Sequence, residues 1–521
     1  MERRIKMKNN AFTLGDNPTI EEFALVAAGA LKVVFTPVVR GRVALARKEL
    51  GILLKKNSTM YGINTGFGQL ATERVSDENL RRLQVNLIRS HACGVGAPLT
   101  AEQARGLMFA RANELARAHS GVRPLIVEKL AEFLNKGLVP YIPSKGSVGA
   151  SGDLAPSAHM ALCLIGEGRA RIAGGSKLRD WAPSGKVLKA LKIKPVELAE
   201  KEGLALINGT QAMQAVGGLA LYDALKLYNA AVLTGAVSVE ALKGTPAAFD
   251  ERIHLLKPHR GQVEAASMLL ELLKGSEIRA SHKRDDKRVQ DPYSLRCMPQ
   301  VLGAVRDAVE YALNTVETEF ASVTDNPLLV WHKGAKTQRR KNGLEVLSGG
   351  NFHGQALAFA FDFAAIAVTA MGNMSERRIA QLVSDFKILP PFLAKNPGLE
   401  SGFMIAHVTA AALASENKIL SHPASADSIP TSANKEDFVS MGMSAALKLG
   451  TIVENVAKIT AIELLAAAQG VEFHRPLRSG ARIEDALARL RRIAPGFRGD
   501  EEFSVRIETV AQAILDGYFL V

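Results

Sequence analysis

Apolar residues recur along part of the chain at the spacing of a helix that packs along one side. In one stretch they alternate in steps of four and three, at Met298, Leu302, Val305, Val309, Ala312 and Val316. Such steps keep side chains on one face of a helix, so the stretch predicts a helix whose seam packs against other helices. The pattern indicates core packing and carries no chemistry of its own.

Two longer segments, Phe352–Val383 and Val439–Ala468, are mostly apolar and contain no proline. From Gly203 onward the chain is rich in Ala and Leu, and it shows no alternating strand pattern of any length. The apolar stretch Ala356–Met371 is interrupted by Asp362, whereas a membrane-spanning helix needs about 20 apolar residues. We therefore expect these segments to be buried helices of a bundle.

The first part of the chain has a different pattern. Residues from about Thr19 to Leu138 show several short helical stretches, and the run Val139–Pro156, rich in Gly, Pro and Ser, breaks all periodicity. The chain has 521 residues, and a single core stops growing near roughly 250–300 residues. The sequence thus predicts an all-α protein with two fused parts: an N-terminal domain over residues 1–202, which carries the reactive loops, and a helical-bundle domain over residues 203–521.

Charge and cysteine content narrow the class of protein. Lys and Arg number 65 against 52 for Asp and Glu, and the net charge of +13 is spread over many segments, which favours solubility and no particular partner. The most basic runs, residues 3–8 and 333–341, lack interleaved aromatic residues, so we expect no nucleic-acid contact. Cys93, Cys163 and Cys297 show neither paired nor metal-ligand spacing, and the N-terminus has no apolar segment suited to secretion. These features predict a cytoplasmic protein without a metal site or membrane contact.

One loop has the residues for an unusual reaction. It reads GSVGASGDLAP over residues 146–156, and its three glycines permit positive-φ conformations that other residues avoid. If the loop is compressed, the amide nitrogen of Gly152 can attack the carbonyl carbon of Ala150. Loss of water from this adduct and dehydration of Ser151 then give an electrophilic methylidene-imidazolone. Composition alone favours a simple turn, and a phosphate-binding loop fits less well because the run has no lysine-and-hydroxyl ending.

The loop and five further segments together resemble one family. Residues 149–154, GASGDL, are similar to the motif of the aromatic amino acid ammonia-lyases and aminomutases. The other segments occur in the family's order along the chain: YGINTGFG at 61–68, GLALINGTQ at 203–211, QDPYSLRCMPQ at 290–300, SGGNFH at 348–353 and NKEDFVSM at 434–441. The resemblance implies a carbon–nitrogen lyase of all-helical fold, a homotetramer in which several subunits build each active site. It also implies that Ala150, Ser151 and Gly152 form a 4-methylidene-imidazol-5-one group, with no external cofactor.

The resemblance assigns roles to residues outside the loop. The electrophile takes the substrate's amino group and makes it a better leaving group, while Tyr61 removes the β-proton; an initial attack by the substrate's aromatic ring is an open alternative. A tyrosine base must be ionised, so its neighbours have to stabilise a phenolate whose ordinary pKa is about 10. Arg296 would clamp the substrate carboxylate with its planar fork. The other residues assigned to the site are Asn208 and Gln290 as hydrogen-bonding groups, Tyr293 as a catalytic residue and Phe352 as an aromatic wall.

Three of these residues are evenly spaced. Tyr293 lies three residues after Gln290 and three before Arg296. If this stretch were helical, the three side chains would share one face.

Two positions indicate the substrate. Ser90-His91 resembles the family members that act on histidine, although some tyrosine aminomutases share this pair. Glu436 stands where the histidine enzymes have glutamate and the phenylalanine and tyrosine enzymes usually have glutamine. A carboxylate accepts a hydrogen bond from an imidazole N–H, whereas a phenyl ring would leave it unpaired. His91 and Glu436 thus predict elimination of ammonia from L-histidine to give trans-urocanate.

Two neighbours of Glu436 depart from the histidine enzymes. Lys435 and Phe438 stand where those enzymes usually have glutamine and histidine, and Lys435 could pair with Glu436. A tyrosine or phenylalanine ammonia-lyase and a 2,3-aminomutase therefore remain as alternatives within the family. An inactive helical scaffold that kept the loop is the alternative outside enzymology.

Overall fold

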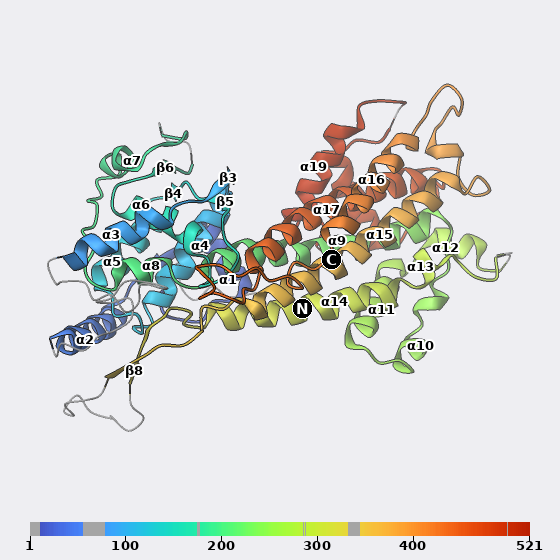
Figure 1. The fold of residues 1–521 in the computed structure, drawn as a ribbon. Coiled ribbons are helices and arrows are strands. Elements are labelled where there is room, and N and C mark those ends of the chain that lie inside the picture. Colours follow the sequence, from blue (N-terminus) through green and yellow to red (C-terminus); the bar gives the residue numbers. More distant parts are fainter. Residues whose placement is uncertain are drawn as a thin grey trace. The chain divides into compact units, whose positions relative to one another are not determined.

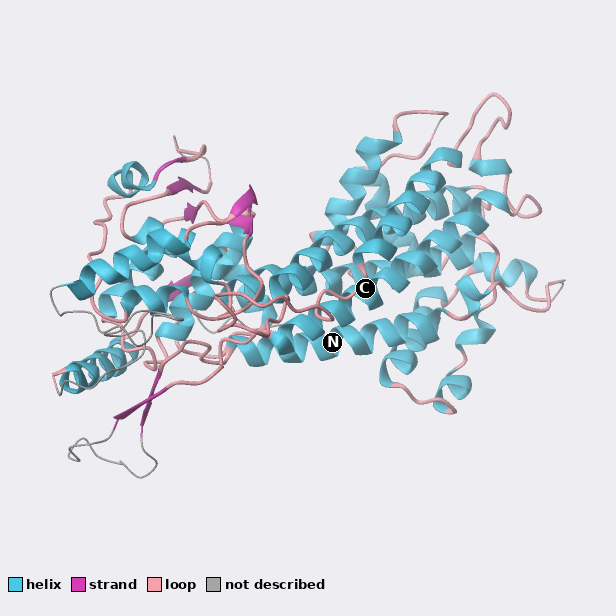
Figure 2. Cartoon of the chain, viewed as in Figure 1, coloured by secondary structure: helices cyan, strands magenta, loops and turns pink. Residues whose placement is uncertain are grey.

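The computed structural model describes residues 11–55, 79–174, 178–284, 286, 288–331, 344–497 and 499–520. Helices dominate these residues, and the strands are few and short (Figures 1 and 2). The predicted all-α class is confirmed. By their contacts the residues group into a first unit, Met1–Leu219, Leu313–Ala360 and Pro423–Leu447, and a second unit, Ala220–Ala312, Phe361–His422 and Lys448–Val521. Each of these units combines several separate segments, whereas the sequence predicted a single division after residue 202. That division stays a prediction.

The first unit holds short helices and small strands. Its helices are α1 (Ile20–Ala28), α2 (Pro37–Leu54), α3 (Leu80–His91), α4 (Ala101–Leu115), α5 (Pro124–Asn135), α6 (Leu154–Leu164), α7 (Ser184–Ala190) and α8 (Glu202–Ile207). Strands β1 (Ala11–Thr13) and β2 (Lys32–Val34) pair in parallel, and β3 (Val95–Pro98) pairs antiparallel with β5 (Pro143–Lys145). Strand β6 (Arg169–Ile172) lies between β4 (Leu138–Pro140) and β7 (Ala182–Pro183). The short helices expected before Leu138 are therefore present.

A hairpin corrects the expectation that no strands follow Gly203. Strands β8 (Leu328–Trp331) and β9 (Leu344–Leu347) pair antiparallel, with Leu328 opposite Leu347. Each strand has only four residues, and one residue in each is buried. So short a strand with a single buried position gives no alternating pattern, which explains why the sequence did not reveal it.

Long helices form the bundle. They are α9 (Gln211–Ala241), α14 (Met298–Phe320), α15 (Gln355–Ser384) and α17 (Gly442–Glu472). Shorter helices accompany them: α10 (Glu251–Leu255), α11 (Arg260–Leu273), α12 (Glu277–His282), α13 (Tyr293–Arg296), α16 (Met404–Leu420), α18 (Ala481–Ile493) and α19 (Phe503–Leu515), with 3-10 turns at Pro246–Phe249 and Pro391–Leu393. All six seam residues of α14 are buried, so the predicted helix is confirmed. Helices α15 and α17 confirm the two long apolar segments.

A buried ion pair joins three of the bundle helices. Arg378 of α15 donates from Nε to Glu463 Oε1 of α17 over 2.5 Å and from Nη2 to Oε2 over 2.8 Å, and both side chains are fully buried. Ser238 of α9 and Ser375 of α15 also donate to Glu463, over 2.6 and 2.5 Å. The carboxylate is thus fully paired, which buried charge requires.

Helix α15 is the one helix of the described residues with the length and composition of a membrane span. Within its most apolar window, 72% of the residues are buried inside the protein. Its Asp362 is buried and lies 2.9 Å from the ammonium of Lys448. These contacts are those of a core helix, as the interruption at Asp362 predicts.

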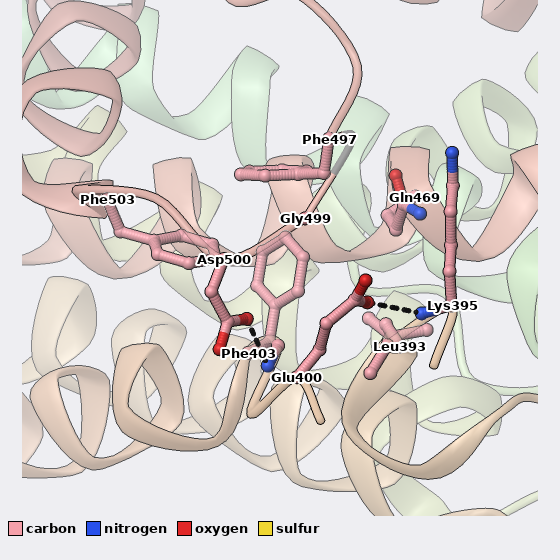
Figure 3. A pocket seen from close by; sticks show the side chains of 11 residues that line it. Leu393, Lys395, Glu400, Phe403, Gln469, Phe497, Gly499, Asp500 and Phe503 are labelled. Carbon is pink, nitrogen blue, oxygen red and sulfur yellow. Dashed lines mark hydrogen bonds between the residues drawn. The ribbon is translucent and has the colours of Figure 1, made fainter. Parts of the chain in front are cut away.

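Aromatic packing fixes the segment that precedes α19. The rings of Phe403, Phe497 and Phe503 meet with centroids 4.8 to 5.0 Å apart (Figure 3). Asp500 accepts hydrogen bonds from the backbone N–H groups of Ser401 and Gly402, over 2.8 and 2.9 Å. The segment is thereby attached to the start of α16 by both apolar and polar contacts.

Burial of Glu240 makes stability depend on pH. Burial raises the pKa of this carboxyl from 4.5 to about 7, although Ser276 Oγ donates to Oε2 over 2.7 Å. Between these two values the folded protein binds the proton more tightly than the unfolded chain, so stability falls as pH rises through this window, by about 3 kcal/mol in all. We expect Glu240→Gln to lack this loss. In denaturant unfolding, the free energy of unfolding of the variant should therefore rise relative to that of the wild type between pH 5 and pH 8. Parallel changes in both proteins would contradict this account of Glu240.

Candidate active site

The loop before α6 has the backbone that its glycines predict. Gly146, Gly149 and Gly152 have φ of 135°, 69° and 73°. Gly152 lies directly against Gly209: the N–H of Gly209 donates to the Ser151 carbonyl over 3.2 Å, and the N–H of Asp153 donates to the Gly209 carbonyl over 2.8 Å. A Cβ at residue 152 would lie 2.1 Å from the Gly209 carbonyl oxygen. The conformation therefore requires glycine at this position.

Asp153 ties the loop to the start of α9. Its buried carboxyl accepts from Ser147 Oγ over 2.7 Å and from the backbone N–H of Met213, in the first turn of α9, over 2.8 Å. Burial raises the pKa of Asp153 to about 6, and the two hydrogen bonds act in the opposite direction. The carboxyl thus holds both ends of the loop against the first turn of a long helix.

The backbone groups of Ser151 and Gly152 differ in their hydrogen bonds. The amide N–H of Gly152 donates no hydrogen bond within the part of the chain that the structure describes. The Ser151 carbonyl accepts a second hydrogen bond, from Asn208 Nδ2 over 3.4 Å. Asn208 Oδ1 is buried and has no partner among the described residues. The carbonyl of Ser151 is therefore fixed, while the nitrogen of Gly152 is left free.

Glu436 points at this loop. Ser151 Oγ donates to Glu436 Oε1 over 2.9 Å, and Thr431 and Ser432 donate to the other carboxylate oxygen, Oε2. No ion pair joins Lys435 to Glu436 among the described residues, so the pairing that the sequence left open is not formed. The carboxylate that the sequence assigned to the substrate's side chain thus lies beside Ser151.

His91 is the last residue of α3 and lines a cavity beside the reactive loop. Its Nδ1 lies 2.8 Å from the Leu87 carbonyl oxygen, and because a carbonyl only accepts, Nδ1 carries the hydrogen. Burial lowers the pKa of the His91 imidazole, while the Leu87 carbonyl and the charge of Glu436 act in the opposite direction. The ring is therefore neutral near pH 7, with Nε2 as an acceptor.

A cavity of about 780 Å³, including its part open to solvent, brings these groups together. All of its lining residues belong to the first unit. They are Ser90, His91, Cys93, Gly146, Ser147, Val148, Ala150, Gly152, Leu154, Ala155, Thr431, Ser432 and Glu436. Thr431 and Ser432 were not among the predicted site residues; their signal in the sequence is two hydroxyl residues shortly before Glu436.

Phe352 belongs to the first unit but does not line this cavity. Its segment is fastened by Asn326, which accepts from the N–H of Gly349 over 2.7 Å and donates to Ser348 Oγ over 3.1 Å. The neighbouring Asp325 forms a fully buried ion pair with Lys201, at 2.8 Å. The segment that contains the half-buried Phe352 is therefore held in place by the hydrogen bonds of Asn326.

The remaining candidates lie elsewhere. Tyr61 lies outside the described residues. Gln290, Tyr293 and Arg296 belong to the second unit. Gln290 precedes α13, whose N-cap is Pro292, so the shared helical face considered for residues 290–296 does not form. Tyr293 is 70% exposed, and the Arg296 guanidinium lies 4.4 Å from the centre of its ring.

The second departure from the histidine enzymes, Phe438, is not among the residues that line the cavity beside Glu436. Its side chain is 62% exposed and stacks on His353, with ring centroids 5.9 Å apart. No cluster of three or more His, Cys, Asp or Glu suited to a metal ion occurs among the described residues.

The fold and this site define a class of protein. A sequence profile described as aromatic amino acid lyase matches residues 19–492. The chain belongs to the aromatic amino acid lyase family, which confirms the family predicted from the loop and its companion segments. A histidine ammonia-lyase of Anaeromyxobacter dehalogenans is 48% identical over 507 residues, which cover 96% of this chain and 98% of the relative.

Solved structures agree in fold and differ in the substrate that they name. The histidine ammonia-lyase from Trypanosoma cruzi matches with a TM-score of 0.88 and 41% identity, over 98% of this chain and 94% of that one. A tyrosine aminomutase from Streptomyces globisporus matches with a TM-score of 0.90 and 35% identity, over 98% of both chains.

The close approach at Gly152 gives a stability prediction. We expect Gly152→Ala to destabilise the fold by about 3 kcal/mol or more, because the new Cβ meets a backbone carbonyl that cannot move aside. Gly275→Ala is a matched control, since Gly275 also has a positive φ, 78°, but open space around its Cβ position. That variant carries only the backbone penalty of about 1 kcal/mol. Equal shifts in the two thermal midpoints would disprove the collision with Gly209.

Proposed function

We propose that this protein eliminates ammonia from L-histidine and releases trans-urocanate. The observation that carries the proposal is the 2.9 Å hydrogen bond between Ser151 Oγ and Glu436 Oε1. It puts a carboxylate suited to an imidazole N–H directly beside the loop that identifies the family. A phenyl ring at the same place would leave this carboxylate without a partner.

The proposal includes a 4-methylidene-imidazol-5-one group formed from Ala150, Ser151 and Gly152. The residues present fit it: the Gly152 nitrogen has no hydrogen bond within the described residues, its backbone has a positive φ and the Ser151 carbonyl is held by Gly209 and Asn208. Closure joins the Gly152 nitrogen to the Ala150 carbonyl carbon with loss of one water, and Ser151 loses a second water. When present, the group supplies an electrophile that makes the substrate's amino group a better leaving group.

The chain's own side chains bind the substrate and move its protons. Glu436 Oε1 accepts an imidazole N–H of the substrate, and the neutral His91 offers Nε2 as a second acceptor in the same cavity. Tyr61, assigned from its motif, removes the β-proton. Asn208 and Gln290 hydrogen-bond the reacting groups, Phe352 forms the wall behind the ring, and Tyr293 takes part in catalysis. Arg296 binds the substrate carboxylate, for which a guanidinium fork is well matched.

We propose a homotetramer whose subunits share active sites. In support, α15 exposes Phe363 and Ile366, and α16 exposes Ile405 and Val408, each pair spaced along one helix face. Exposed apolar stripes of this kind mark contact surfaces. Sedimentation at micromolar concentration would show a tetramer. The cysteine pattern supports a cytoplasmic location.

One experiment tests the substrate. The purified protein is incubated separately with L-histidine, L-tyrosine and L-phenylalanine, and the products are identified by NMR. We expect urocanate and ammonia from histidine only. Coumarate, cinnamate or a β-amino acid in place of urocanate would replace the proposal with another member of the family. No product from any of the three would favour the inactive scaffold.

A further inference from the structure

The two carboxylate oxygens of Glu436 have different partners. Thr431 Oγ1 donates to Oε2 over 2.9 Å, and Ser432 Oγ donates to the same oxygen over 2.7 Å. Oε1 accepts from Ser151 Oγ of the reactive loop. We call the two hydroxyls of Thr431 and Ser432 the hydroxyl clamp. The clamp occupies one oxygen, and the other contacts the reactive loop.

An unusual backbone makes the clamp. Ser432, Ala433 and Asn434 have φ of 51°, 54° and 62°. Consecutive non-glycine residues in the left-handed conformation are unfavourable and persist only where the surroundings hold them. The N–H of Thr431 donates to the Glu436 carbonyl over 2.9 Å, and the N–H of Glu436 donates to the Thr431 carbonyl over 3.3 Å. This turn brings two hydroxyls that are four and five residues away onto one carboxylate oxygen.

Ring formation changes the partners of Glu436. The Ser151 hydroxyl that Oε1 accepts from is the group lost in the second dehydration. Once it has left, Oε2 keeps both hydroxyl donors while Oε1 has lost its own. Glu436 and His91 line the same cavity, where an imidazole N–H can take the place of the Ser151 hydroxyl. The clamp therefore leaves Oε1 as the oxygen available for a new donor.

We propose that Thr431 and Ser432 are positioning residues that set the preference for an imidazole side chain by fixing Glu436 with Oε1 towards the substrate. This inference rests on the proposed function and adds two residues to it. A glutamate held in one orientation loses no rotamer freedom when substrate binds, and a binding group fixed in advance gives both affinity and selectivity. Without the clamp the carboxylate has several rotamers, and only some present an oxygen to the imidazole.

The test combines kinetics with intact mass. Thr431→Val and Ser432→Ala remove one hydroxyl each with little change of shape, and the double variant removes the clamp. Thr431→Ser keeps a hydroxyl and serves as the rescue. Ser428→Ala is the matched control, because Ser428 Oγ accepts from the Val439 N–H in the same loop region and has no hydrogen bond to Glu436 among the described residues. Each protein is measured for kcat and KM with L-histidine and for the mass lost on ring formation.

We expect the double variant to lose at least about tenfold in kcat/KM for histidine, mainly through a higher KM, because an oriented binding group is lost. Each single variant loses less, while Thr431→Ser and Ser428→Ala stay close to wild type. All five proteins have lost two waters, which shows that the reactive loop is intact. If the wild type turns over histidine and the double variant has the same kcat/KM as the wild type, the inference is wrong and the proposed function is unaffected. A wild type that does not consume histidine would instead remove the proposed function itself.

Discussion

Replacing Ser151 by alanine lowers the turnover of L-histidine by about three orders of magnitude or more, comparable to the loss of a catalytic nucleophile. Alanine has no hydroxyl to eliminate, so no methylidene forms. The same variant retains its fold, because the side chain makes a single hydrogen bond, to Glu436. The measurements are kcat with histidine, far-UV circular dichroism and intact mass, which shows one water lost at most.

Ser157→Ala is the control for this variant. Ser157 is a serine of α6 whose buried hydroxyl has no partner among the described residues, so its removal leaves activity and mass loss unchanged. If Ser151→Ala kept substantial turnover, the electrophile could not come from Ser151. If the wild type showed no loss of water, the reactive group would be absent from the start.

Replacing Glu436 by glutamine is expected to lower kcat/KM for L-histidine by about 10²-fold, because a hydrogen bond to a charged acceptor contributes roughly 1.5–3 kcal/mol. Selectivity for histidine over phenylalanine falls with it, since the amide no longer favours an N–H donor alone. Steady-state kinetics with both amino acids measures this ratio.

Asp437→Asn is the matched control for Glu436. It removes the same charge from the adjacent residue, which is exposed. We expect this control to keep the wild-type preference for histidine. Equal effects of the two substitutions would mean that net charge matters and that the contact of Glu436 with the reactive loop does not.

The sequence predicted the elements that are long or strictly spaced. The seam of α14 and the lengths of α15 and α17 follow from a helical period maintained over many residues. The hairpin of β8 and β9 was not predicted, because a strand of four residues has too few positions to show an alternating pattern. The helix face expected to hold Gln290, Tyr293 and Arg296 did not form. Helix α13 has Pro292 as its N-cap, so Gln290 lies outside the helix.

The sequence predicted a set of candidate site residues and not how they are arranged. The positive φ of Gly149 and Gly152 agrees with the prediction from glycine. The contact of Glu436 with Ser151 was not predicted, and the role of Glu436 towards the substrate stays a prediction. The hydroxyl clamp could not be predicted, because it depends on three left-handed residues that have the sequence Ser-Ala-Asn and include no glycine. Backbone conformation held by tertiary contacts leaves little trace in residue type.

The backbone contact between Gly152 and Gly209 has a consequence for the order of events during synthesis. The Ser151 carbonyl is held by Asn208, 57 residues later, and the Ser151 hydroxyl by Glu436, 285 residues later. A ribosome that has made only the first half of the chain has therefore produced none of the partners that Glu436 and its turn supply. At roughly 5–20 residues per second, synthesis of the 57 residues up to Asn208 takes seconds, whereas the 285 residues up to Glu436 take tens of seconds. The backbone contacts of the loop are therefore available well before the contact of the Ser151 side chain with Glu436.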